Sequence, residues 1–266
     1  MSADTPIQAG ARVTGARVTG AFAAALAFAV APDAHAQSPL AQGLLDLPAN
    51  DRPAAERYQT PDGRVRFVLD RSGQRAALVK FEGDDEVHVL RPVPGPRGDD
   101  IYKTDTGDVL LRVTALGGVI VYTDAARTGA PATLAGQARP MAPPSPPQDG
   151  LQARMAALQR EAARRGRPVT FVAPSNVQGA ASAVVADAAA RAAEGLAQAP
   201  QAMTVRRVVI RYGARPEASV IDENLTITVA PQLGYAGRPS AAAVAQAVRQ
   251  PRRVTVETAD VQGPPQ

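Results

Sequence analysis

The 266-residue chain has no cysteine and no tryptophan, and only two lysines and two histidines. Without cysteine it can form no disulfide, no iron–sulfur or thiolate zinc site, no thiol nucleophile and no lipidated N-terminal cysteine. One histidine, His35, falls in a segment that we expect to be removed, which excludes a multi-histidine metal site from the mature chain. The apolar share of 45% and the near balance of 29 basic and 25 acidic side chains fit a soluble protein of one or two domains.

Motifs for phosphate binding and for nucleophilic catalysis are also missing. The sequence has no Gly-Lys-Ser/Thr and no Gly-x-Gly-x-x-Gly, so it indicates no glycine-rich phosphate loop. The second histidine, His88, alternates with Val87 and Val89, which predicts a solvent-facing side chain on a strand. Adjacent carboxylates such as Asp99 and Asp100 would point to opposite sides of a strand. We therefore predict no catalytic, cofactor-binding or metal-binding residue.

The first 36 residues have the features of a secretory signal peptide. Arg12 and Arg17 precede an uninterrupted apolar run at 21–31, and Ala34 and Ala36 form an Ala-x-Ala cleavage site. The apolar run has about half of the roughly 20 residues that a membrane span requires. We expect cleavage after Ala36 and export to the periplasm or the extracellular space, and no other segment has the length of a membrane span.

An antiparallel β domain is predicted at 58–124, after a lead-in segment at 37–57. Apolar side chains such as Val65, Phe67 and Leu69 alternate with polar ones, which is typical of strands with one buried face. Tight-turn signals separate five or six such runs. The pattern predicts a β meander, either a small barrel or one twisted sheet.

A proline-rich linker is expected at 125–150. Five prolines fall between Pro140 and Pro147, a composition that favours extended polyproline geometry and a semi-rigid spacer.

A second domain of mixed α and β structure is predicted at 151–258, followed by a disordered tail at 259–266. After an amphipathic helix from Leu151, the patterns indicate strand, helix, strand, strand, helix and strand. The last of these strands falls at 254–258. The order βαββαβ is ferredoxin-like, so the whole chain is assigned to the α+β class.

The charge differs between the two predicted domains. Residues 58–124 carry nine basic and eleven acidic side chains, whereas residues 151–266 carry fourteen and eight. One interpretation is an anion- or partner-binding patch, and the other is a set of solvent-facing arginines paired with nearby acids. Nucleic acid is disfavoured as a partner by the export signal and by the few aromatic side chains. The patch would consist of Arg206, Arg207, Arg211, Arg252 and Arg253.

Two resemblances follow from particular segments. Asp100–Val113, Leu116–Tyr122 and Asp222–Val229 resemble an uncharacterised family of exported alphaproteobacterial proteins of unknown function, which implies no activity. Pro94–Tyr102 forms a loop followed by a tyrosine, and here the β region is similar to periplasmic inhibitors of C-type lysozyme. The chain lacks the cysteines and the serine-containing loop of those inhibitors, so this second resemblance does not by itself imply inhibition.

We therefore expect a two-domain exported protein of unknown function that acts as a non-catalytic binding module of the cell envelope. Its partner would be an envelope protein or an anionic envelope component, and its oligomeric state is left open. The alternative is a carboxylate-dependent hydrolase with a site between the two domains. That site would use Asp222 and Glu223 together with Arg211.

Overall fold

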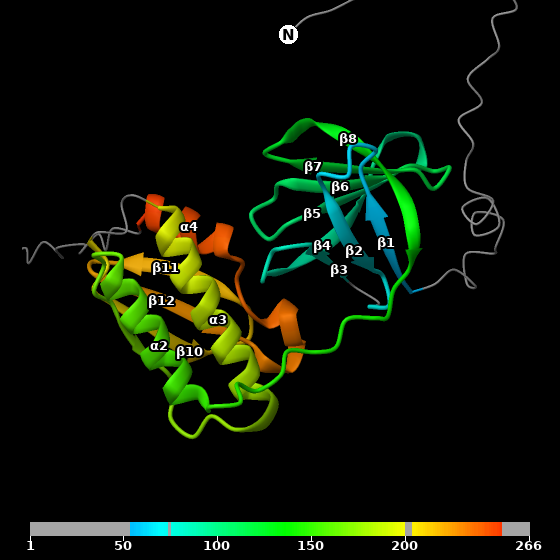
Figure 1. Cartoon of the computed structure of the whole chain (residues 1–266). Coiled ribbons are helices and arrows are strands. Elements are labelled where there is room, and N and C mark those ends of the chain that lie inside the picture. Colours follow the sequence, from blue (N-terminus) through cyan, green and yellow to red (C-terminus); the bar gives the residue numbers. More distant parts are fainter. Residues whose placement is uncertain (1–53, 74–75, 200–203, 252–266) are drawn as a thin grey trace, which may run out of the picture. The chain divides into compact units, whose positions relative to one another are not determined.

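The computed structural model describes residues 54–73, 76–199 and 204–251, drawn in colour in Figure 1. These residues all belong to one compact unit. The predicted signal peptide at 1–36, the expected strand at 254–258 and the tail at 259–266 lie outside the described residues. Arg252 and Arg253 do so as well.

The alternating pattern predicts five or six strands in a small barrel or one twisted sheet, and the structure shows a closed antiparallel barrel of eight strands. Each strand pairs with the next, and the last strand pairs with the first. Phe67 and Leu69 point inward and are 3% and 0% exposed, so they form part of a continuous apolar core. The strands are β1 (Ala55–Gln59), β2 (Arg66–Asp70), β3 (Ala77–Phe81), β4 (Val87–Pro94), β5 (Asp100–Lys103), β6 (Val109–Val113), β7 (Val119–Thr123) and β8 (Ala126–Gln137).

The structure differs from the expected linker at β8, which closes the barrel between β7 and β1. Its alanines, threonines and glycines give little hydrophobic alternation, so the sequence pattern resembled a spacer. Gly129 has a φ of 88°, and a Cβ there would lie 2.8 Å from side-chain atoms of Ile120 and Tyr122. This close approach requires glycine. The segment that connects the barrel to the next helix is therefore 138–150, which retains the proline-rich stretch.

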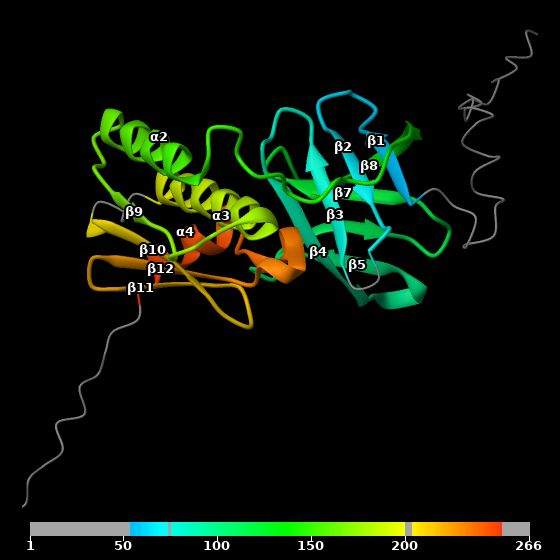
Figure 2. The same cartoon turned by 90° about the horizontal axis from the view of Figure 1, so that it is seen from below.

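The C-terminal half is a four-stranded sheet with helices packed on one face (Figure 2). The sheet order is β11-β12-β10-β9, in which β9, β10 and β12 are parallel and β11 is antiparallel to β12. The elements are α2 (Leu151–Arg164), β9 (Thr170–Val172), α3 (Gly179–Gln198), β10 (Arg207–Tyr212), β11 (Glu217–Ile221), β12 (Asn224–Val229), the 3-10 segment η4 (Pro231–Gly237) and α4 (Ala241–Arg249).

The mixed α and β content of this half agrees with the sequence analysis, but the ferredoxin-like arrangement is not confirmed. Strand β11, with its single fully buried side chain at Val220, was not expected. It forms a hairpin with β12 at the edge of the sheet. The described sheet thus has an order that the sequence analysis did not predict.

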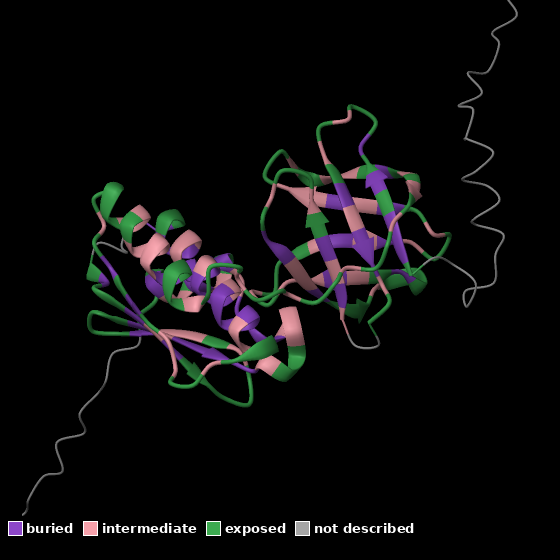
Figure 3. Cartoon of the chain, turned by 60° about the horizontal axis from the view of Figure 1, so that its bottom comes forward, coloured by how far each residue is buried: buried purple, intermediate pink, exposed green. Residues whose placement is uncertain are grey.

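Small residues allow the helices of this half to approach closely. Val184, Val185 and Ala188 of α3 pack on the sheet together with Val244 of α4, and Figure 3 shows the buried helix and strand faces turned toward each other. A Cβ at Gly195 would lie 2.5 Å from the Ala241 carbonyl oxygen, so the contact between α3 and α4 depends on glycine. In the part of the chain that the structure describes, none of the helices is long and apolar enough to span a membrane.

Candidate functional site

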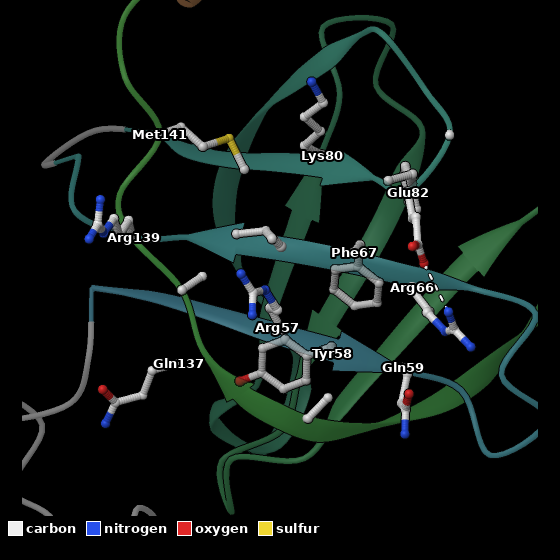
Figure 4. Close-up of a pocket in the computed structure, with 15 residues that line it drawn as sticks. Arg57, Tyr58, Gln59, Arg66, Phe67, Lys80, Glu82, Gln137, Arg139 and Met141 are labelled. Atoms are coloured by element: carbon white, nitrogen blue, oxygen red, sulfur yellow. Dashed lines mark hydrogen bonds and ion pairs between the residues drawn. The ribbon is translucent and has the colours of Figure 1, made fainter.

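A groove lies on the outer face of the barrel, over β1, β2 and β3 (Figure 4). Arg57, Val68 and Lys80 are aligned across the three strands and point outward because their neighbours Tyr58, Phe67 and Phe81 contribute to the core. The groove has a volume of about 920 Å³. We call it the barrel groove.

One wall of the barrel groove is formed by the chain that follows β8. Ala138, Arg139 and Met141 line this wall. The Ala138 amide donates to the Ala55 carbonyl at 2.9 Å, and the Met141 amide donates to Oδ2 of the buried Asp70 at 2.5 Å. The wall is thus held at both ends by hydrogen bonds to the barrel, so the groove is present without a ligand.

The charge of the barrel groove is strongly positive. Arg57, Lys80 and Arg139 are exposed, and among the described residues none of the three forms an ion pair with a carboxylate. Arg66 also lines the groove, but its Nη1 lies 3.3 Å from Oε2 of Glu82, the one acidic side chain among the lining residues. Three cations therefore remain available to an anionic ligand.

A second polar feature joins the barrel to the C-terminal half. The guanidinium of Arg238 is buried and donates to Glu86 Oε1 at 2.9 Å, to Asp187 Oδ2 at 2.6 Å and to the Val87 carbonyl at 2.9 Å. Arg191 completes the group, with its Nη1 3.8 Å from Glu86 Oε2. We call Glu86, Asp187, Arg191 and Arg238 the junction cluster.

Burial controls the electrostatics of the junction cluster. Removal from water raises the pKa of Glu86, an effect that the nearby Arg238, His88 and Arg191 oppose only in part. The Glu86 carboxylate also accepts from the Ala241 amide at 3.3 Å, at the first turn of α4. These contacts hold β4 against α4, which indicates a structural role.

Asp105 of the β5–β6 turn makes a further contact with α4. Its Oδ2 accepts from the Ser240 amide at 2.8 Å, and its Oδ1 accepts from the Ser240 hydroxyl at 2.6 Å. Ser240 in turn caps α4 by accepting from the Ala243 amide at 3.0 Å. Two barrel carboxylates thus interact with the positive end of the α4 helix dipole.

A smaller cavity of about 630 Å³ lies beside the junction cluster. We call it the junction pocket. Lys80, Asp85 and Val87 of the barrel line one side, and Asp187 and Arg191 of α3 line the other. The junction pocket is also lined by Pro144, Ser145, Pro147, Asp149, Arg154 and Tyr235.

The structure leaves the sequence-predicted arginine patch incomplete. Arg206, Arg207 and Arg211 are exposed, and Arg207 and Arg211 lie on the face of β10 that the helices do not cover. The Arg211 Nε donates to Thr228 Oγ1 at 3.1 Å. The other two members lie outside the described residues, so the patch stays a prediction.

The residues of the hydrolase alternative are not brought together. Asp222 and Glu223 form the turn between β11 and β12, next to Asn224, which pairs with Arg207. Arg211 pairs with Thr228, four residues further along, which corresponds to about 13 Å of strand. The described part of the chain also contains no group of three or more His, Asp or Glu side chains arranged to hold a metal ion.

The prediction for His88 was wrong. His88 lies on the inner side of β4 with Leu90, and its Nε2 is 3.0 Å from Asp84 Oδ2. Val87 faces outward yet is buried, because the C-terminal half covers it at the junction pocket. Because the outward-facing Val87 is buried and apolar, the sequence pattern assigned the inner side of β4 to the wrong residues.

Sequence reasoning missed the barrel groove. The sequence pattern assigns Arg57 to the lead-in segment and Arg139 to the linker, and it connects neither residue with Lys80. The strand alternation predicts that Arg66 points outward, but only the pairing of β1 with β2 and of β2 with β3 places the cations on one surface.

Comparisons with known proteins place the chain in a family. No curated protein and no solved structure matches it. One family model matches residues 39–248, which include both the barrel groove and the junction cluster. The chain therefore belongs to the family described as Domain of unknown function (DUF4908).

Proposed function

We propose that this protein is an exported, non-catalytic binding protein of the cell envelope that binds an anionic component through the barrel groove. The observation that carries the proposal is the presence of Arg57, Lys80 and Arg139 around one cavity without a carboxylate partner among the described residues. Unpaired cations in a concave surface attract anions from solution.

The types of side chain in the groove fit a carboxylate, sulfate or phosphate group. The guanidinium groups of Arg57 and Arg139 each present several N–H donors in a planar fork that matches such oxyanions. Lys80 adds a flexible point charge, and the amides of Gln59 and Gln137 add neutral hydrogen-bonding groups. The groove thus offers both charge and hydrogen bonds to a polar anion.

The same lining residues support binding rather than catalysis. Glu82, the acidic side chain of the groove, is paired with Arg66, and the described lining contains no histidine or serine. A general base within reach of a nucleophile is the minimum that acid–base hydrolysis requires. The groove therefore favours a ligand that is held and released unchanged.

Export is supported by the N-terminal sequence, in which Arg12 and Arg17, the apolar run and Ala36 stand in the order of a signal peptide. The likeness of the β region to periplasmic C-type lysozyme inhibitors stays a prediction. Fractionation of cells that produce the full chain with a C-terminal tag tests the export. We expect the tagged protein in the periplasmic or extracellular fraction with Gln37 as its first residue, and an uncleaved cytoplasmic chain would contradict this.

A comparison of two charge-matched variants tests the binding site. The mature chain is applied to immobilised heparin, a sulfated polysaccharide, and eluted with increasing salt. The groove variant carries Arg57→Ala, Lys80→Ala and Arg139→Ala, and the control carries Arg206→Ala, Arg207→Ala and Arg211→Ala. Both lose three positive charges, so a difference between them reports position rather than net charge.

We expect the groove variant to elute at clearly lower salt than the wild type and the control variant to elute close to the wild type. Equal elution of the groove variant and the wild type would overturn the assignment of the barrel groove. A shift confined to the control variant would instead assign anion binding to the arginines of β10.

A further inference from the structure

We propose that the ligand of the barrel groove is a linear acidic polysaccharide that continues from the groove into the junction pocket. This inference rests on the proposed function and names its ligand class. Its starting point is Lys80, which lines both cavities.

The two cavities are connected by one row of outward-facing residues. Arg57 pairs with Val68, Val68 pairs with Lys80, and Lys80 pairs with Val87 across the neighbouring strands. The first three belong to the barrel groove, and Val87 lies in the junction pocket. Three strand spacings separate Arg57 from Val87, about 14 Å, which exceeds the size of a single sugar ring.

The same stretch of chain forms a wall along both cavities. Arg139 and Met141 border the barrel groove, and Pro144, Ser145 and Pro147 border the junction pocket. Proline fixes φ and has no N–H donor, so the backbone of this wall has few alternative conformations. A wall that continues along both cavities favours a long ligand over a compact one.

Charge along the path indicates that the ligand carries hydrogen-bond donors as well as anionic groups. The barrel groove is cationic, whereas the junction pocket combines Arg154 and Arg191 with Asp85, Asp149 and Asp187. A linear polyphosphate has no hydroxyl groups along its length and would offer these three carboxylates only anions. In an acidic polysaccharide the carboxylates can meet the cations, while the ring hydroxyls donate hydrogen bonds to the acids.

The aromatic side chains of the path favour sugars over nucleobases. Tyr58 and Phe67 border the barrel groove but are buried in the barrel core, so their rings are not available for base stacking. Tyr235 of η4 lines the junction pocket and is half-buried. One partly covered ring can pack against a sugar but cannot stack successive bases.

The test uses oligogalacturonates of increasing length, from the monomer upward, with binding to the mature chain measured by isothermal titration calorimetry. We expect the affinity to increase with length by at least about tenfold and then to level off once both cavities are filled. The groove variant Arg57→Ala/Lys80→Ala/Arg139→Ala should weaken binding of every length.

A matched pair of variants on α2 tests the junction pocket. Arg154 lines the pocket, and Arg160 is exposed on the same helix but is not among the lining residues. We expect Arg154→Ala to weaken binding of the longest oligomers by about three- to fivefold, the effect of one exposed charge contact. The monomer should bind this variant unchanged, and Arg160→Ala should have no effect on any length.

The failures of this inference and of the proposed function are distinguishable. A monomer that binds as tightly as the long oligomers, with the groove variant still impaired, overturns the extended ligand but leaves the anion site. Tighter binding of oligothymidylate or linear polyphosphate of matched length overturns the polysaccharide class. If no oligogalacturonate binds and heparin retention does not depend on the groove, both proposals fail.

Discussion

The guanidinium of Arg238 and the carboxylate of Glu86 form a buried ion pair, 2.9 Å between Nη1 and Oε1, that joins residues 152 positions apart in the sequence. Because Arg238 also binds Asp187, it neutralises a carboxylate from each half of the protein. Arg238 therefore links the barrel to the C-terminal half, together with the contacts of Arg191 with Glu86 and of Ser240 with Asp105.

Arg238→Ala should destabilise the protein by about 3–5 kcal/mol, because it leaves the buried Glu86 and the half-buried Asp187 without their shared partner. The free energy of unfolding from urea denaturation measures this. Arg215→Ala is the control, since Arg215 is exposed, and we expect a change within about 0.5 kcal/mol. Equal effects of the two substitutions would show that the junction cluster does not stabilise the fold.

Glu86→Gln should change how stability depends on pH. Burial raises the pKa of Glu86 above its ordinary value of 4.5 in the folded protein. The folded state binds this proton more tightly than the unfolded state does. The resulting contribution to the free energy of unfolding is complete below pH 4.5 and is lost as pH rises through the pKa of Glu86 in the folded protein. We expect the wild type to lose stability relative to Glu86→Gln as pH increases from about 4 to 7.

Urea denaturation of the wild type and of Glu86→Gln across this pH range measures the difference between their free energies of unfolding. Asp84 and Asp99, whose pKa values are lowered by hydrogen bonds from the Glu86 amide and from Arg112 respectively, change stability in the opposite direction. The contributions of Asp84 and Asp99 to the pH dependence are present in both the wild type and Glu86→Gln, so they cancel when the two are compared. A difference that does not vary with pH would show that the pKa of Glu86 is not raised.

Asp105→Ala should cost about 1 kcal/mol, because it removes the two hydrogen bonds to Ser240 at the start of α4. Asp124→Ala is a control in which a fully exposed carboxylate is lost from the turn before β8. Thermal unfolding should show a lower Tm for the first variant and a nearly unchanged Tm for the second. The reverse order would mean that the turn does not support the helix.

Gly195→Ala should destabilise the protein, although alanine normally strengthens a helix by about 1 kcal/mol relative to glycine. The new Cβ would lie 2.5 Å from the Ala241 carbonyl oxygen and 2.6 Å from Val244 Cβ, so α3 and α4 must separate. We expect a net loss of about 1–3 kcal/mol in urea denaturation. A gain in stability would show that the two helices are less closely packed.

The strand alternation of the barrel was predictable because its inner side chains, such as Val79 and Leu111, are large and its turns are rich in glycine. Strand β8 was not predictable, because its inward residues include Ala130 and Ala132, which carry little hydrophobic signal. Strand β11 is short and lies at an edge. It therefore needs few apolar residues.

The candidate site was harder to predict than the fold. Arg57 and Arg139 belong to segments that the sequence assigned to a lead-in and a linker, and their proximity depends on strand register and on the anchoring of Met141 by Asp70. In the junction cluster, Asp187 and Arg191 form a local i,i+4 pair on α3, but no local pattern connects them with Glu86 or Arg238. A single sequence contains no information on such pairings beyond charge complementarity.

The scarcity of lysine makes Lys80, the side chain that lines both cavities, accessible to selective labelling. Reductive methylation with isotopically labelled formaldehyde would place NMR probes only on Lys80, Lys103 and the N-terminal amine. Lys103 is on β5 and lines neither cavity, so its signal serves as an internal reference. The native chain thus carries a spectroscopic reporter at the place where a ligand would pass from the barrel groove into the junction pocket.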